Sequence, residues 1–255
     1  MANWNLAETT YGVAREQSYE VAVLPVGATE AHGLHLPYAT DSIQVEAIAR
    51  AACADADARG AKVLLLPTIP YGINENNLGF KWTMSLRPST LFTVISDLVS
   101  SAEEHGIPKL LVLNGHGGNE FQPLLRELIR ETTVQVLLVN WYGVVRHKEL
   151  FEKPGEHADE METSLLLHLN AELVRRDLAG EGAVRKPVLT ALQEGWAWVA
   201  RPWDRFTHDS GFGDPSLASA EKGEKCMKAV VAKIADLLVE MSAAEVDEWY
   251  PYQGD

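Results

Sequence analysis

The sequence is poor in cysteine, and this shortage excludes two classes of protein. Only two cysteines, Cys53 and Cys226, occur in 255 residues, and they lie far apart in the chain. A disulfide scaffold or a closely spaced zinc knuckle is therefore excluded, and we expect both thiols to fill the core. A chain of this length buries roughly 70–75% of its extended surface, so it needs no covalent staples.

Positive charge and long apolar runs are also scarce. There are 22 Lys and Arg against 36 Asp and Glu, which gives a formal net charge of −14. Nucleic-acid binding relies on clustered Lys and Arg, so we expect no nucleic-acid partner. No run approaches 18 apolar residues, and residues 1–10 lack the pattern of a secretory signal. We therefore expect a cytoplasmic enzyme that neither spans nor binds a membrane.

Several catalytic motifs are missing as well. The sequence has no G-x-S-x-G, which disfavours a hydrolase with a nucleophile elbow. It has neither G-x-x-x-x-G-K-[ST] nor G-x-G-x-x-G, so no nucleotide-phosphate cradle is predicted. Acidity does not argue against a metal, because carboxylates are metal ligands.

What the sequence does contain is an alternation of strand and helix patterns. Apolar runs without polar alternation predict buried strands, and stripes of 3.6-residue period predict helices between them. This order favours one α/β domain over residues 1–255, with a mostly parallel sheet covered on both faces. The predicted strands are 21–26, 62–66, 109–113 and 134–140, and the main predicted helices are 41–59, 89–102 with Ser89 as its cap, 120–131, 161–169 and 219–241.

Three polar stretches hold the candidate functional residues. Residues 27–35 follow the first predicted strand, residues 114–119 follow the third, and residues 156–164 come later. Ligands of open parallel sheets gather at the carboxyl ends of the strands, which is where the first two stretches lie. Together the three stretches hold four of the eight histidines and many carboxylates.

These residue types suit a pair of divalent cations. Imidazole nitrogen and carboxylate oxygen are the donors that such ions prefer, and a two-metal site needs a bridging carboxylate. If residues 27–32 are extended, Glu30 and His32 point to the same side. If residues 156–164 form a helix, His157 and Glu160 share a face at i, i+3. The matching inventory is Glu30, His32, Asp41, His116 and a Glu from the third stretch.

Each of these residues also has a purely structural interpretation. Asp41 and Asn119 are suited to cap the helices that follow them. The glycines at 115, 117 and 118 suit a tight turn, and residues 156–162 suit a solvated acidic face. Only the combination of three ligand-rich stretches favours a metal site over these alternatives.

The combined motifs resemble the creatininase (creatinine amidohydrolase) family over roughly residues 15–240. The resemblance rests on residues 24–33, the eight residues between His32 and Asp41, residues 114–116, Glu156-His157 and residues 162–164. It implies a three-layer α/β/α fold and two divalent metal ions, with zinc as the first expectation and manganese as the second. It also implies a small-molecule substrate and a homo-oligomer, usually a hexamer.

The resemblance implies a role for each matched residue. Glu30 and His116 would bind one metal and His32 the other, while Asp41 would bridge the two. His157 would be the acid/base that delivers a proton to the leaving nitrogen. Glu156 or Glu162 would orient His157, as a carboxylate partner does for many catalytic imidazoles.

The glycine turn departs from creatininase itself. Creatininase has a metal-binding Glu at the position of Gly118 and an aromatic residue at that of Gly117. Other branches share the His-Gly-Gly-Asn turn and carry a Glu three residues after the later His, where this chain has Glu160. We therefore expect a branch of the family other than creatininase, with Glu160 as the replacing ligand.

The same departures bear on the substrate. Trp82 stands near the expected mouth of the site, Trp141 matches a substrate-contacting aromatic or else fills core, and amides near Gly117 and Gly118 would stabilise an oxyanion. Of Trp196, Trp198 and Trp203, at least two are expected in the core. The first expectation is hydrolysis of a cyclic amide or formamide C–N bond. Its alternatives are C–C hydrolysis of a cyclic diketone sugar such as 3-dehydro-scyllo-inosose, and a metal-binding protein without activity.

Overall fold

The side chains of strand β1 (Val21–Val26) alternate between two apolar cores. Val21 and Val23 face one core, and Ala22 and Leu24 face the other, because successive side chains of a strand point to opposite faces. A computed structural model describes residues 3–153 and 155–254. In it the sheet is a central layer with apolar contacts on both sides.

The sheet has four parallel strands in the order β2-β1-β3-β4. In register, Val21 lies beside Val63 and Lys109, and Lys109 lies beside Gln135. The other strands are β2 (Val63–Leu65), β3 (Lys109–Asn114) and β4 (Gln135–Asn140). The predicted α/β class with a parallel sheet is confirmed.

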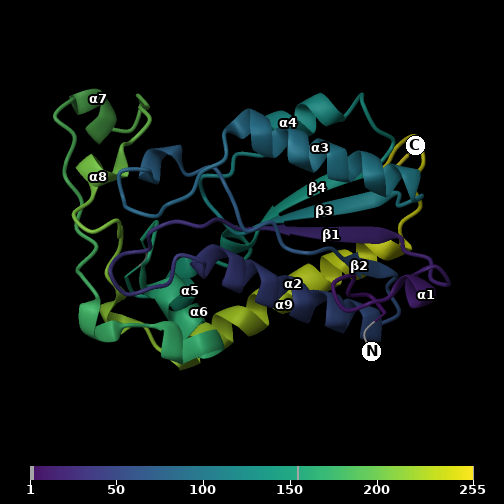
Figure 1. Ribbon diagram of the computed structural model, residues 1–255, viewed down its shortest axis with the longest axis horizontal. Helices are drawn as coiled ribbons and strands as arrows, with labels where there is room; N and C mark the ends of the chain where they lie inside the picture. Colours follow the sequence, from purple (N-terminus) through teal and green to yellow (C-terminus); the bar gives the residue numbers. More distant parts are fainter. Residues whose placement is uncertain (1–2, 154, 255) are drawn as a thin grey trace.

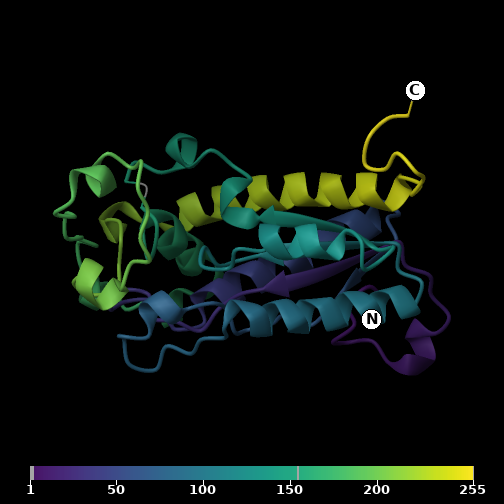
Figure 2. The same ribbon diagram turned by 90° about the horizontal axis from the view of Figure 1, so that it is seen from above.

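Helices cover both faces of the sheet, which makes three layers (Figure 1). One face packs on α2 (Thr40–Ala58), α6 (Glu160–Asn170) and α9 (Ala220–Ala243), the other on α3 (Pro88–Glu104) and α4 (Gln122–Leu128). Figure 2 shows α9 and α3 on opposite sides of the strands. Helix α3 begins one residue before Ser89 and has Arg87 at its N-cap, so the predicted cap is wrong. Cys53 and Cys226 are buried in the core, as expected.

Short elements complete the described chain. The short α-helices are α1 (Tyr11–Ala14), α5 (His147–Leu150), α7 (Thr190–Gln193) and α8 (Trp203–Phe206). The 3-10 turns are η1 (Glu75–Asn77), η2 (Trp141–Gly143), η3 (Ala171–Leu173), η4 (Arg176–Leu178) and η5 (Pro215–Leu217). None of the described helices combines the length and the apolarity that crossing a bilayer requires.

Residues 180–213 form an arm at one end of the molecule, and they include α7 and α8. The carboxyl ends of the strands point toward this arm (Figure 1). The chain after β1 enters α2 on one face, and the chain after β3 enters α4 on the other. Since β1 and β3 are neighbours, the sheet reverses its winding between them, and ligands of open α/β sheets bind at such a point.

Candidate metal centre

Acidic and imidazole side chains converge beyond the carboxyl ends of β1 and β3. Glu30 and His32 follow β1, Asp41 lies in the first turn of α2, and His116 follows β3. Three overlapping groups have ligand atoms within 4.8 Å of one another: Glu30, His32 and His157; Glu30, Asp41 and His116; and His32, Asp41 and Glu162. Residues from four separate segments thus face a common point.

Asp41 lies between two of the histidines. Its Oδ1 is 3.1 Å from Nε2 of His32, and its Oδ2 is 3.2 Å from Nδ1 of His116. The same nitrogen of His116 lies 3.0 Å from Oε1 of Glu30. One carboxylate with an oxygen toward each side is the arrangement that a residue shared by two cations requires.

The donor set fits divalent cations. Oε1 of Glu30 and Oδ2 of Asp41 are buried without a well-aligned hydrogen bond among the described residues, and both lie close to the same nitrogen, Nδ1 of His116. One nitrogen shared by two buried carboxylates leaves them short of donors, which is unfavourable, so these atoms are suited to a positive ligand. Mixed nitrogen and oxygen donors of this kind match zinc and manganese.

Charge coupling within the cluster shifts the pKa values strongly. Burial lowers the pKa of His32, but the charge and hydrogen bond of Asp41 outweigh it and raise that pKa to about 10. Burial raises the pKa of Glu30, yet His116 and His157 lower it to about 2. Burial opposes charge on His116 too, and Glu30 with Asp41 raises its pKa well above the ordinary value. The carboxylates therefore hold positive charge near them.

Glu160 does not join this cluster, so the expectation that it replaces the missing ligand is corrected. Its side chain is fully buried, and its Oε2 accepts hydrogen bonds from the backbone amides of Glu152 and Lys153, at 2.9 and 2.6 Å. Its Oε1 pairs with the ammonium of Lys222. Glu162 is the carboxylate of this segment that lies with His32 and Asp41.

The correction has a local cause. Helix α6 begins at Glu160, because the Asp159 side chain caps it by accepting from the amides of Met161 and Glu162. His157 therefore precedes the helix and pairs with Phe212 in an isolated bridge. The i, i+3 relation assumed between His157 and Glu160 needs both residues in the helix, and only Glu160 is.

His157 is held beside the cluster with one nitrogen free for chemistry. Its Nε2 lies 2.8 Å from the carbonyl oxygen of Ala31, which can only accept, so Nε2 carries the hydrogen. Its Nδ1 lies 3.7 Å from Oε1 of Glu30. Burial, assisted by the charge of His32, lowers the pKa of His157 to about 4. The neutral ring thus presents an unprotonated Nδ1 toward the cluster.

The glycine turn after β3 supports His116 by close packing. A Cβ at Gly118 would lie 2.4 Å from Nε2 of His116 and 2.5 Å from the carbonyl oxygen of Ile73, whereas one at Gly117 would meet nothing within 4 Å. Position 118 therefore has no room for a glutamate in this conformation. Asn119 does not cap α4, since its carboxamide accepts from the amide of Ile73 and donates to Asn114.

The other predicted site residues, Trp82, Trp141 and Glu156, differ in their contacts and in their burial. Trp82 is 72% exposed and has φ +70°, and its neighbour Thr83 accepts a hydrogen bond from the amide of Ala31. The backbone beside Trp82 therefore lies close to the segment that carries Glu30 and His32. Trp141 is buried in the core, which agrees with the packing alternative. Glu156 is mostly exposed, and within the described residues its carboxylate pairs with Arg201 at 2.9 Å and not with the His157 ring.

Some residues at the cluster were not predicted from the sequence. Asn77, in the 3-10 turn η1, donates to Oε2 of Glu30 although the two residues are distant in sequence. The Tyr142 hydroxyl lies 3.5 Å from Nδ2 of Asn114, the last residue of β3, and burial with the charges of Asp41 and Glu162 raises the pKa of Tyr142 to about 12. Glu162 was part of the family motif at residues 162–164 and was expected at most to orient His157, so only its place beside His32 and Asp41 was missed.

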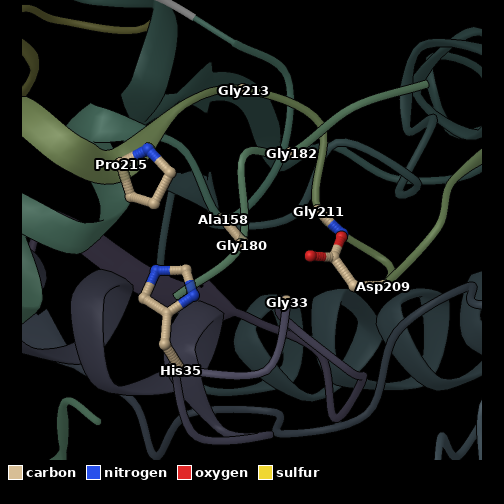
Figure 3. A pocket seen from close by; sticks show the side chains of 9 residues that line it. All are labelled: Gly33, His35, Ala158, Gly180, Gly182, Asp209, Gly211, Gly213 and Pro215. Carbon is tan, nitrogen blue, oxygen red and sulfur yellow. The ribbon is translucent and has the colours of Figure 1, made fainter. Parts of the chain in front are cut away.

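Only one of the three tryptophans on the arm is buried. Trp196 and Trp198 are exposed, and Trp203 packs edge-on against the His157 ring at a centroid distance of 5.0 Å. The expectation of at least two core tryptophans is therefore wrong. A crevice beside the site brings His35 and Asp209 near each other, with glycines of the arm around them (Figure 3).

Comparison with known proteins agrees with this geometry. The family model described as creatininase, creatinine amidohydrolase, matches residues 7–238. A crystal structure of a putative creatinine amidohydrolase from Bacteroides fragilis superposes with a TM-score of 0.90 at 38% identity, covering 97% of this chain and all of that one. A structure named "Creatininase Mn" reaches a TM-score of 0.77 at 25% identity, covering 94% of this chain and 99% of that one.

A curated relative extends the comparison to another activity. The mycofactocin precursor peptide peptidase of Mycobacterium ulcerans is 30% identical over 216 residues, which is 82% of this chain and 80% of the relative. The family model's range of residues 7–238 covers the strands and all three ligand-bearing stretches. The chain belongs to the creatininase family of hydrolases.

Proposed function

We propose that the chain is a metal-dependent hydrolase that opens a cyclic amide, or cleaves a related C–N bond, in a small polar molecule. The observation that carries the proposal is the convergence of Glu30, Asp41, Glu162 and three histidines on one point. Two ions held there would lower the pKa of a coordinated water toward about 7 and polarise a carbonyl group.

The chain's own residues have distinct tasks in this proposal. Glu30 and His116 would hold one ion, His32 and Glu162 would hold the other, and Asp41 would contribute to both. His157 keeps its Nε2 hydrogen on Ala31, so its Nδ1 is free to receive a proton and pass it to the departing nitrogen. Water adds across the C–N bond, giving a carboxylate and an amine. The amides near Gly117 and Gly118 and the indole of Trp82 are proposed to contact the substrate.

A second candidate reaction uses the same residues. A relative named 3-dehydro-scyllo-inosose hydrolase, from Thermotoga maritima, is 24% identical over 248 residues. Hydrolytic C–C cleavage of a cyclic diketone sugar would give an acid without nitrogen, whereas the C–N reaction gives an acid and a freed nitrogen group, which stay in one molecule when the substrate is a ring. A metal-binding protein without activity is the third alternative, and it would leave the free Nδ1 of His157 without a task.

Metal analysis followed by a turnover screen tests the proposal. The purified protein should hold close to two ions per chain, with zinc expected before manganese. It should turn over at least one of creatinine, a formamido-pyrimidine, a short peptide or an inosose. Mass and NMR analysis of the product identifies the bond cleaved, because hydrolysis of the first three frees a nitrogen group and hydrolysis of an inosose does not. Activity that survives complete removal of metal by a chelator would refute the proposal. Metal without turnover of any compound would favour the third alternative.

Two further expectations stay predictions. The family resemblance implies a homo-oligomer, with a hexamer as the first choice, and composition favours a cytoplasmic location. Light scattering of the purified protein gives the mass of the assembly directly.

A further inference from the structure

We propose that Arg201 is a positioning residue that fixes the imidazole of His157 through Trp203 and Glu156. The inference rests on the proposed role of His157 as the proton carrier. It assigns a task to a charged residue of the arm that no motif singles out.

A continuous stack joins Arg201 to His157. The guanidinium carbon of Arg201 lies 5.6 Å from the ring centroid of Trp203, and it also lies 5.0 Å from that of Phe206. Trp203 in turn packs edge-on against His157, with an interplanar angle of 72°. A cation over an aromatic face is attracted by the ring's quadrupole, so Arg201 restrains the indole that touches the imidazole.

Arg201 also ties the loop of His157 to the arm. Its Nη2 lies 2.9 Å from Oε2 of Glu156, the residue directly before His157. The guanidinium of Arg201 therefore contacts both Glu156, which precedes His157 in sequence, and Trp203, which packs against its ring. This gives Glu156 an indirect task, since its carboxylate contacts Arg201 and not the imidazole.

Backbone hydrogen bonds fix the arm against the segment that carries His157. The amides of Glu156 and His157 donate to the carbonyl oxygen of Phe212, and the amide of Phe212 donates to that of His157. A Cβ at Gly155 would lie 2.3 Å from the same Phe212 carbonyl oxygen, so the two strands of chain touch closely. These hydrogen bonds fix the backbone of His157. They do not fix the rotation of its imidazole about the side-chain bonds, which depends on side-chain contacts.

The imidazole of His157 is held by polar and aromatic contacts together. Its Nε2 hydrogen bond to Ala31 fixes one edge, and the ring also contacts those of Trp203 and His32, whose centroids lie 5.0 Å and 4.1 Å from its own. Trp203 is itself buried, while the Arg201 side chain is 42% exposed. Substituting Arg201 is therefore expected to loosen the stack without opening the core.

Histidine-selective NMR of the zinc-loaded protein tests the positioning directly. The His157 signal is identified as the one missing from a His157→Asn variant. The Trp203 ring current should shift it away from the range of an exposed histidine. We expect Arg201→Gln to move this signal toward that range, with Arg201→Lys moving it less, because Lys keeps the charge but not the planar stack. The buried His35, whose Nε2 lies 2.9 Å from the hydroxyl of Thr163, reports whether the fold is intact.

Kinetics on whichever substrate the screen finds give the second measurement. We expect Arg201→Gln to lower kcat about 10-fold with KM changed less than about twofold, within the 10²-fold loss that slight misplacement of reacting groups can bring. Arg201→Lys should recover part of kcat. Arg205→Gln is the matched control, because Arg205 lies on the same arm and its guanidinium has no ion pair or ring contact among the described residues.

A double-mutant cycle separates the indirect task of Glu156 from a direct one. If Glu156 acts through Arg201, Glu156→Gln lowers kcat in the parent protein and has no further effect in Arg201→Gln. Independent effects that multiply would overturn the inference. So would an unmoved His157 signal in Arg201→Gln, and that readout decides the positioning even if the proposed reaction proves wrong.

Discussion

The imidazole of His32 lies 3.1 Å from the carboxylate of Asp41, although eight residues separate them in the chain. A bridge between His32 and Leu36 turns the chain back, and the hydroxyl and amide of Thr40 both donate to the carbonyl oxygen of Pro37. The turn delivers Asp41 to the start of α2, facing the residues after β1. This placement makes Asp41 common to two of the three ligand groups.

Asp41→Asn should therefore release metal. An amide oxygen carries no charge to offset two cations, so we expect the content to fall by at least one ion per chain and turnover to fall by 10²-fold or more. Elemental analysis of the dialysed protein measures the first and the substrate assay the second. Asp57→Asn, at the exposed end of the same helix, is the control. Full metal content in Asp41→Asn would contradict the bridging role.

Substitutions of Glu162 and Glu160 should have different effects, the first on metal content and the second on stability. Glu162→Gln is expected to lose one ion per chain with little change in Tm of the metal-stripped protein. Glu160→Gln should keep both ions but weaken the charged hydrogen bonds to Lys222 and two amides, lowering the free energy of unfolding by about 1.5–3 kcal/mol. Elemental analysis and urea unfolding distinguish the two. The opposite pattern would restore Glu160 as the ligand.

The glycine turn offers a matched pair of variants. Gly118→Ala places a methyl group against His116 and the Ile73 carbonyl, so we expect loss of metal affinity and of activity. Gly117→Ala meets open space and should change metal affinity less than twofold. Zinc titration with a competing chromophoric chelator measures both. Equal behaviour of the two variants would show that the turn does not position His116.

Metal binding should release protons. The pKa of His32 is raised to about 10, that of His116 is raised, and burial raises that of Glu162 to about 8, so all three are largely protonated in the metal-stripped protein at pH 7. A ligand must lose its proton to bind, and affinity therefore falls as the pH is lowered. Calorimetric titration of zinc in buffers of different ionisation enthalpy should give two to three protons released per chain. His105→Asn should give the same number, and zero release would contradict these pKa directions.

Much of the fold followed from the sequence because its signals are local. The apolar run at 21–26 and the stripe of α9 predict their elements without any distant contact, and each was found within a few residues of its predicted bounds. The polar residues after β1 and β3 were also identifiable, since parallel strands end at one edge of a sheet. The cap of α3 was misassigned because Pro88, a favourable first helical residue, moved the start to the residue before Ser89.

The choice between Glu160 and Glu162 shows where local reading stops. Both carboxylates occur in the same acidic stretch, and an assumed helix through His157 favoured Glu160. The Asp159 cap starts the helix later, and Lys222 on α9 provides a partner for Glu160. Neither the cap's register nor the position of a lysine 62 residues away follows from spacing alone.

By itself, then, the sequence determined the class of fold, the types of donor atom and the strand ends where they gather, because periodicity and residue chemistry act over a few neighbouring positions. The tertiary structure alone decided which carboxylate faces the cluster, which tryptophan touches His157 and that Arg201 joins them. Those outcomes depend on contacts between segments far apart in the chain, whose distances only the packed layers fix.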